Sequence, residues 1–144
     1  MPFVLDASVA VKWYLDEDHS AESRSLLADP PDLLVPDFFY AEVANALWKR
    51  SKRGDLTRDR AAEVLDYLLA APVEVHPSMP LMPTAFRFAA ESNTAVYEMV
   101  YLALARREKC AVVTADRRFF ADMRAGGHAG LVRWIADLSS DSIH

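Results

Sequence analysis

The chain has 144 residues, 52% of them hydrophobic and 26% charged, and its formal net charge at pH 7 is -5. This composition fits one domain with a sizeable core, and the mildly acidic balance argues against a generally basic nucleic-acid-binding surface while it allows a local basic groove. The sequence has no apolar run near the roughly 18 residues of a membrane span, no basic start typical of a signal peptide and only one cysteine, so we expect a cytoplasmic protein without a disulfide or a membrane contact.

Short hydrophobic runs alternate with longer helical patterns along the chain, which is typical of an α/β fold with a parallel sheet. The expected strands are residues 3–5, 33–35, 73–75, 111–114 and 131–135. The expected helices are residues 9–15, 21–28, 38–52, a segment from 57 that a proline stops at 72, a segment from about 83 to 92, and residues 94–105 and 117–124. No repeat or linker interrupts the pattern, so we expect one domain over residues 1–138 and a polar tail over residues 139–144.

Several residues mark where the helices should begin and end. Ser8 and Asp37 each precede a helical run and have side chains that accept hydrogen bonds from a first helical turn, so we expect both to be N-caps. Gly54 is expected to end the helix before it, and Asn93 to turn the chain between two helices. In the helix that begins at Thr57, the expected buried stripe is Ala61, Val64, Leu65, Leu68 and Leu69.

Glu98 is the only charged residue in the helical segment 94–105, which reads TAVYEMVYLALA. The segment is apolar on nearly every side and should be buried. An unpaired carboxylate there would cost several kcal/mol, on the usual order of magnitude, or would take up a proton unless a cation lay beside it. Arg106, two turns further on, is one candidate partner. A bound cation shared with other acids is the interpretation that we favour.

Three further acids lie where such a cation could be shared. Asp6 and Asp116 each follow an expected strand directly, and ligands of open parallel sheets bind at the carboxyl ends of the strands. Taken singly, Asp6 could be a turn residue and Asp116 a helix cap. Glu42 borders the buried stripe of its helix, where the helix dipole alone would favour an acid in the first turn. Together with Glu98, two strand ends and two helix faces can bring four carboxylates to one edge.

A carboxylate cluster of this kind predicts a metal site, because like charges repel one another without a cation. The sequence has no Cys/His spacing typical of zinc, and oxygen ligands favour Mg²⁺ or Mn²⁺. Such an ion binds phosphate oxygens and activates water for in-line attack on phosphorus. A phosphatase that forms an aspartyl phosphate on Asp6 is a weaker alternative, since that chemistry usually needs a second aspartate two residues on, where this chain has Ser8.

Four blocks of the sequence resemble the PIN-domain ribonucleases, and in particular the VapC-type toxins of bacterial and archaeal toxin–antitoxin operons. The blocks are FVLDASVAVKW, VPDFFYAEVANALWK, VYEMVYLALA and VVTADRRF. The resemblance covers nearly the whole chain and implies a three-layer α/β/α PIN-like fold with a central parallel sheet of about five strands. It implies that the catalytic, metal-binding residues are Asp6, Glu42, Glu98 and Asp116. It also implies that hydroxyl groups line the pocket at Ser8 and Thr114.

One position departs from the family pattern. The third acid of the family is usually aspartate, after a tyrosine, whereas here Tyr97 is followed by Glu98. The extra methylene keeps the charge but moves the carboxylate, so the geometry of the metal site is expected to differ. The alternative to an active enzyme is therefore a non-catalytic PIN-like interaction module, in which Glu98 has altered the site and the protein only binds partners.

The resemblance also implies an activity and a set of partners. These are Mg²⁺- or Mn²⁺-dependent hydrolysis of single-stranded or looped RNA, a homodimer, and inhibition by a cognate VapB-type antitoxin whose C-terminal segment crosses the active-site groove. Arg117 and Arg118, beside Asp116, are the residues that we expect to contact RNA phosphates. The basic residues over 49–53 are more simply a solvated helix end, and the acidic run 16–18 a solvated turn.

Overall fold

The computed structural model describes residues 2–138, and the tail expected over residues 139–144 lies outside them. Its centre is a five-stranded sheet in which each neighbouring pair is parallel. No helix within residues 2–138 is both long and apolar enough to cross a membrane. The strands are β1 (Phe3–Leu5), β2 (Leu33–Pro36), β3 (Glu74–His76), β4 (Ala111–Thr114) and β5 (Val132–Trp134).

The strand order is β3-β2-β1-β4-β5, with β1 in the middle. The chain moves outward from β1 through β2 to β3, then returns to the other side of β1 for β4 and β5. The strand order therefore reverses between β1 and β4, and the carboxyl ends of these two strands lie at the point where open parallel sheets bind their ligands. The predicted α/β fold with a parallel sheet is confirmed.

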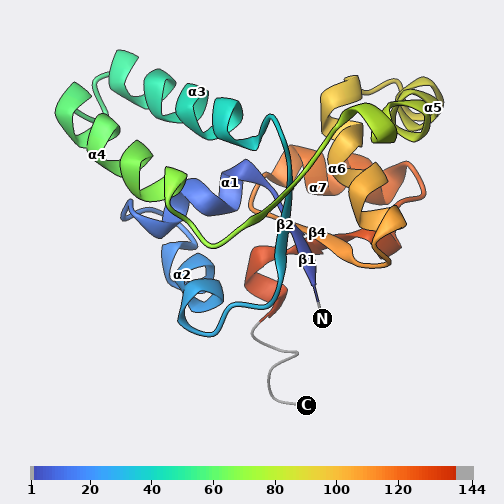
Figure 1. Cartoon of the computed structure of the whole chain (residues 1–144), viewed down its shortest axis with the longest axis horizontal. Coiled ribbons are helices and arrows are strands. Elements are labelled where there is room, and N and C mark those ends of the chain that lie inside the picture. Colours follow the sequence, from blue (N-terminus) through green and yellow to red (C-terminus); the bar gives the residue numbers. More distant parts are fainter. Residues whose placement is uncertain (1, 139–144) are drawn as a thin grey trace.

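Helices cover both faces of the sheet, as Figure 1 shows. Side chains alternate along each strand, so that Val4 and Val112 join one hydrophobic core while Leu5 and Val113 join the other. The first core is covered by α5 (Met82–Ser92), α6 (Val96–Arg107) and α7 (Arg117–Ala125). The second is covered by α1 (Ala7–Ala10), α2 (Ser20–Ala28), α3 (Phe39–Lys52) and α4 (Arg58–Leu69). The expected three layers are present.

The first helix differs from the expected one. It starts two residues earlier than the helix predicted over 9–15, and a 3-10 turn over Val11–Trp13 follows its four residues. Ser8 lies inside the first turn rather than at the N-cap. Its hydroxyl instead accepts a hydrogen bond from the Ala115 backbone N–H at 3.0 Å, so it joins the end of β1 to the end of β4.

Asp37 is not the N-cap of α3 either, because Phe38 occupies that position. The Asp37 carboxylate accepts a hydrogen bond from the backbone N–H of Ser78 at 2.9 Å. In both helices the side chain expected at the N-cap instead accepts a hydrogen bond from a backbone N–H in a distant part of the chain.

The other residues expected at helix ends are placed correctly, while the helix expected over 94–105 spans Val96–Arg107. Gly54 has a φ of 86° after the end of α3, Asn93 has a left-handed φ of 53° after α5, and Thr57 caps α4 by accepting from Arg60 N–H at 3.1 Å. Leu69 is the exception in the expected stripe, since it is 53% exposed at about 100° around the helix from the buried position before it. The stripe members that pack inward are Ala61, Val64, Leu65 and Leu68.

Candidate metal and active site

The topology brings three of the four predicted acids to one pocket. Asp6 follows β1, Asp116 follows β4, and Glu42 lies in the first turn of α3; all three line a pocket of about 480 Å³. Glu98, in the first turn of α6, lies outside that lining and accepts a hydrogen bond from Arg118 Nη2 at 3.2 Å. Its side chain is 26% exposed. The expectation that Glu98 is buried is wrong, and its place in a metal site stays a prediction.

Two hydroxyl groups fix the carboxylate of Asp6. Ser8 Oγ donates to Asp6 Oδ2 at 2.6 Å and Thr114 Oγ1 donates to the same oxygen at 2.8 Å. Each hydroxyl also accepts a backbone N–H from the β4–α7 turn, Ser8 from Ala115 and Thr114 from Asp116, both at 3.0 Å. Ser8 lines the pocket as expected. Thr114 does not: it is fully buried and positions Asp6 from behind.

A buried phenol holds Glu42. Tyr101 donates its hydroxyl hydrogen to Glu42 Oε1 at 2.7 Å, which joins α6 to α3. Burial, followed by the charges of Asp6 and Glu42, raises the pKa of Tyr101 well above its ordinary value, so the phenol stays a donor. Our sequence reasoning missed this residue. The signal was available, because Tyr101 follows Glu98 by three positions and shares its helix face.

The acids lie close enough to act on one another. Burial raises the pKa of Asp6 above its ordinary range; the two hydroxyl hydrogen bonds oppose the rise, and the charge of Asp116 adds to it. Burial also raises the pKa of Glu42; the Tyr101 hydrogen bond opposes this rise, and the charges of Asp6 and Glu98 add to it. A site that collects negative charge in this way is stabilised by a cation.

The donor set suits a hard divalent cation, although the side chains are not gathered around one point. Among residues 2–138, no three acidic, histidine or cysteine side chains are arranged to hold a metal ion as they stand. The carboxylates of the pocket nevertheless supply oxygen ligands of the type that Mg²⁺ and Mn²⁺ prefer. Their mutual repulsion favours such an ion, so the residues fit it in chemistry, while Glu42 accepts from Tyr101 and Asp116 accepts from the Phe119 N–H as the cap of α7.

The family of the chain follows from comparison with known proteins. The model of the PIN domain family matches residues 3–125. The chain belongs to this family. A curated relative, Ribonuclease VapC3 of Pyrobaculum aerophilum, is 32% identical over 120 residues, which cover 82% of this chain and 92% of the relative.

Two solved structures have a similar fold. A crystal structure of a Pyrobaculum aerophilum protein has a TM-score of 0.74 at 21% identity, covering 98% of this chain and 88% of that one. The crystal structure of VapBC2 from Rickettsia felis, bound to a DNA fragment from their promoter, contains a chain with a TM-score of 0.65 at 14% identity, covering 93% of this chain and 98% of that one. The predicted PIN-like fold and the resemblance to VapC proteins are confirmed.

The two arginines that we expected to contact RNA phosphates do not line the pocket of this PIN domain. Arg118 donates to Glu98, and the guanidinium of Arg117 lies over the Trp134 ring with 5.0 Å between its carbon and the ring centroid. Both side chains are exposed. Their contact with RNA phosphates therefore stays a prediction, and Arg118 has a partner within the protein that RNA would have to replace.

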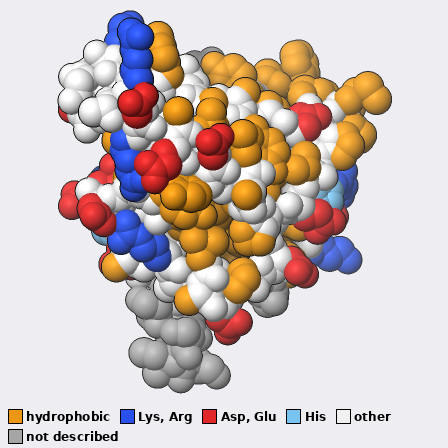
Figure 2. Space-filling model, turned by 60° about the vertical axis from the view of Figure 1, so that its left-hand side comes forward, with side chains coloured by type: hydrophobic (Ala, Val, Ile, Leu, Met, Phe, Trp, Pro, Cys, Tyr) orange, Lys and Arg blue, Asp and Glu red, His pale blue; other side chains and the backbone are white. Residues whose placement is uncertain are grey.

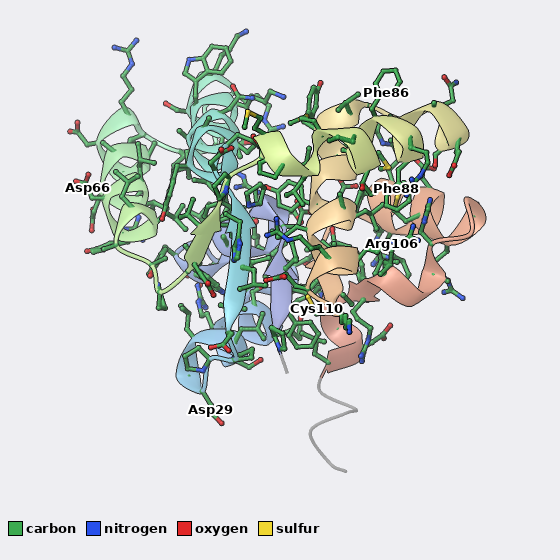
Figure 3. All side chains as sticks on the ribbon, turned by 45° about the vertical axis from the view of Figure 1, so that its right-hand side comes forward. Asp29, Asp66, Phe86, Phe88, Arg106 and Cys110 are labelled. Atoms are coloured by element: carbon green, nitrogen blue, oxygen red, sulfur yellow. The ribbon has the colours of Figure 1, made fainter. Side chains whose placement is uncertain are left out.

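Arg106, the residue considered as a partner for Glu98, makes a different contact. Its guanidinium lies over the Phe88 ring at 5.5 Å from the centroid, and Figure 3 shows the two side chains next to each other between α5 and α6. That alternative is wrong, because Arg106 is at the other end of α6 and Arg118 of α7 reaches Glu98 first.

The basic residues of the PIN-domain pocket are ones that our sequence reasoning set aside. Lys12, Lys49 and Arg50 line the pocket together with the acids. Glu17, expected in a solvated turn, accepts from Lys12 Nζ at 3.1 Å and from Arg50 Nη2 at 2.9 Å. A helical signal existed, because Lys49 and Arg50 follow Glu42 by seven and eight positions and so share its face of α3.

Proposed function

We propose that this chain is a VapC-type toxin, an endoribonuclease that depends on bound Mg²⁺ or Mn²⁺ and hydrolyses phosphodiester bonds of RNA. The observation that carries the proposal is the meeting of Asp6, Glu42 and Asp116 in one pocket, where their charges repel one another. The similarity to Ribonuclease VapC3 over 82% of the chain supports RNA as the substrate class. We assign the nuclease domain to residues 1–138 and propose that the protein acts in the cytoplasm.

The acids of the pocket would hold the ion. Asp6 contributes a carboxylate whose direction is set by two hydroxyl groups, and Glu42 one whose direction is set by Tyr101. Asp116 is exposed at the start of α7, where its carboxylate can also meet a ligand from solvent. Glu98 would join them after it leaves Arg118. When bound, the ion supplies positive charge to the phosphate oxygens and the means to activate a water molecule for attack on phosphorus.

The protein's own part in this chemistry is to fix directions before the substrate arrives. Ser8 and Thr114 hold Asp6 in a single orientation, and they are themselves held by backbone N–H groups of the β4–α7 turn. Such preorganised support limits the reorganisation that accompanies the reaction. Asp6 is partly buried where it lines the pocket, and this strengthens the charge interactions there.

We further propose that exposed hydrophobic side chains bind two partners, a VapB-type antitoxin and a second copy of the chain. Figure 2 shows hydrophobic side chains gathered across the middle of the face that it presents, with acidic and basic side chains around them. Exposed surfaces of this kind are typical of interaction sites. Within residues 2–138, the large exposed hydrophobic residues are Trp48, Tyr67, Leu69, Val75, Met79, Phe86 and Tyr97.

The experiment that tests the nuclease is cleavage of a fluorescent RNA mixture, single-stranded and looped, by the parent and by Asp6→Asn and Asp116→Asn. We expect cleavage by the parent in Mg²⁺ or Mn²⁺, none in EDTA, 5′-phosphate ends on the products, and little cleavage by either variant. Circular dichroism confirms that the variants are folded. Folded variants that cut RNA as fast as the parent would contradict the proposal.

The competing function is the non-catalytic interaction module. The ion pair of Glu98 with Arg118 favours it, since this pair keeps the fourth acid away from the others. Melting temperature separates the two functions, because an ion that binds only the folded state raises it by mass action. The nuclease requires a rise on titration with Mn²⁺, whereas no rise up to millimolar Mn²⁺, together with no RNA cleavage, would establish the interaction module.

A further inference from the structure

We propose that Arg50, with Lys12 and Lys49, forms a subsite for a phosphate of the RNA backbone next to the phosphate that is cleaved. The inference rests on the proposed function and adds how the substrate is held. Its starting point is the composition of the pocket, which is lined by three acids and by three bases. The acids alone would repel a polyanion, so a nucleic acid that enters needs nearby cations.

The first step is the unusual anchoring of two of these cations. Lys12 Nζ and Arg50 Nη2 both donate to one oxygen, Oε1 of Glu17. Their side chains are only 13% and 21% exposed, so they are held in place rather than free in solvent. One carboxylate cannot neutralise two cations, and this cluster retains a positive charge at the wall of the pocket.

The second step is the unused hydrogen-bonding capacity of the cluster. Arg50 Nη1 makes no hydrogen bond within the described residues, and because it is shielded from solvent a phosphate meets it only after the guanidinium turns toward the pocket. Lys49, exposed on the same helix, makes no ion pair there either. A guanidinium offers a planar set of donors that matches a phosphate group.

The third step is position along α3. Arg50 follows Glu42 by eight residues, which is about 12 Å along a helix axis. At this separation along the helix, we infer that the group Arg50 meets is a neighbouring phosphate of the same strand rather than the one that Glu42 helps to cleave. Sequence plays no part in this contact, because every nucleotide presents the same phosphate.

The test is binding of a short, fluorescently labelled single-stranded RNA, followed by fluorescence anisotropy in EDTA over a series of salt concentrations. Arg50→Ala is expected to weaken binding about tenfold and to lower the slope of log Kd against log salt by about 0.7, the value for one phosphate contact to a single strand. Arg50→Lys should keep the slope and lose only part of the affinity, because it keeps the charge without the planar fork.

The matched control is Arg53→Ala. Arg53 lies just past the end of the same helix, binds Asp55 and is 65% exposed, and it is outside the lining of the pocket. This variant should leave both the affinity and the salt slope unchanged. Melting temperature is measured for all variants, since loss of the Glu17 ion pair lowers stability whether or not RNA is bound.

The outcomes separate the subsite from the nuclease. If Arg50→Ala melts earlier but binds RNA with the affinity and salt slope of the parent, Arg50 is a structural partner of Glu17 and the subsite is overturned, while metal-dependent cleavage by the parent still supports the nuclease. If the parent neither binds nor cuts RNA, both are overturned.

Discussion

Asp6 and Glu98 are acids of one expected site, and the structure treats them in opposite ways. Asp6 follows the central strand, where two hydroxyl groups donate to one of its oxygens and burial raises its pKa. Glu98 lies on the first turn of a helix, partly exposed, with its carboxylate on an arginine. At the end of the sheet, groups from two neighbouring strands fix the position of an acid. On a helix surface, a longer acidic side chain is not fixed by the backbone and can pair with a nearby base.

The largest expected effect is on cleavage. Asp6→Asn should lower the rate of RNA cleavage about 10³-fold or more, because it removes a fixed charge from the metal site. Glu98→Gln should lower it only about tenfold, because this side chain must first leave Arg118. The measurement is the initial rate at saturating Mn²⁺ for both variants. Equal losses of cleavage rate would show that Asp6 and Glu98 contribute equally to the metal site.

The support beneath Asp6 can be removed without changing side-chain volume. Thr114→Val deletes the donor to Asp6 and the acceptor of the Asp116 N–H, and should lower the cleavage rate about 10- to 100-fold, as loss of support behind a metal ligand does. The free energy of unfolding should fall by about 1–3 kcal/mol because a backbone donor loses its partner. Urea unfolding gives that value. A rate equal to the parent would mean that Asp6 does not depend on its hydroxyl groups.

The pH dependence of stability tests the raised pKa values of the two acids, which come first from burial and then from neighbouring charges. The pKa values of Asp6 and Glu42 are raised on folding, so between the ordinary carboxyl pKa near 4 and the raised values the folded state binds more protons than the unfolded state. The stability that these groups contribute is therefore present at low pH and lost as pH rises through the folded-state values.

Urea unfolding in EDTA is the measurement for this pH dependence. We expect the free energy of unfolding of the metal-free protein to increase as pH falls from 7 toward 5. Asp6→Asn should flatten that dependence and raise the stability of the metal-free protein at pH 7. A free energy of unfolding that decreases steadily as pH falls over this interval in the parent would contradict the raised pKa values of Asp6 and Glu42.

The smallest expected effect is on the affinity for Mn²⁺ and concerns Glu98. Arg118→Ala frees Glu98 and removes a positive charge near the site, so Mn²⁺ should bind about two- to fivefold more tightly, by simple electrostatics at the protein surface. The change in unfolding free energy should stay under about 1 kcal/mol, because the pair is exposed to solvent. Titration of Mn²⁺ against melting temperature follows both quantities. Weaker binding would instead make Arg118 part of the support for the ion.

The acids at the strand ends could be predicted from sequence because their position depends on short-range pattern. A hydrophobic strand followed by an acid, as at Asp6 and Asp116, fixes the place of the carboxylate once the sheet is parallel. The position of the Glu42 carboxylate could likewise be predicted, because Glu42 borders the buried stripe of its helix. The parallel sheet and the place of three of the four acids were therefore within reach of local rules.

The partners of these residues were not within reach, because they come from distant parts of the chain. Glu98 meets Arg118 across 20 positions and Glu17 meets Arg50 across 33. Ser8, which local rules assign to a helix cap, finds a donor 107 positions away. Such contacts depend on how the helices pack, and neither periodicity nor capping preference contains that information.

The hydrogen bond between Tyr101 and Glu42 has a consequence for how the protein loses function. It joins one helical layer to the other at the carboxyl ends of the strands. The main helical contact of α3 is with α4. Local opening of that helix pair breaks the bond and displaces a carboxylate of the site, while the central strands stay paired. On gentle heating, inactivation should therefore precede global melting, with early amide hydrogen exchange in α3 and late exchange in β1 and β4.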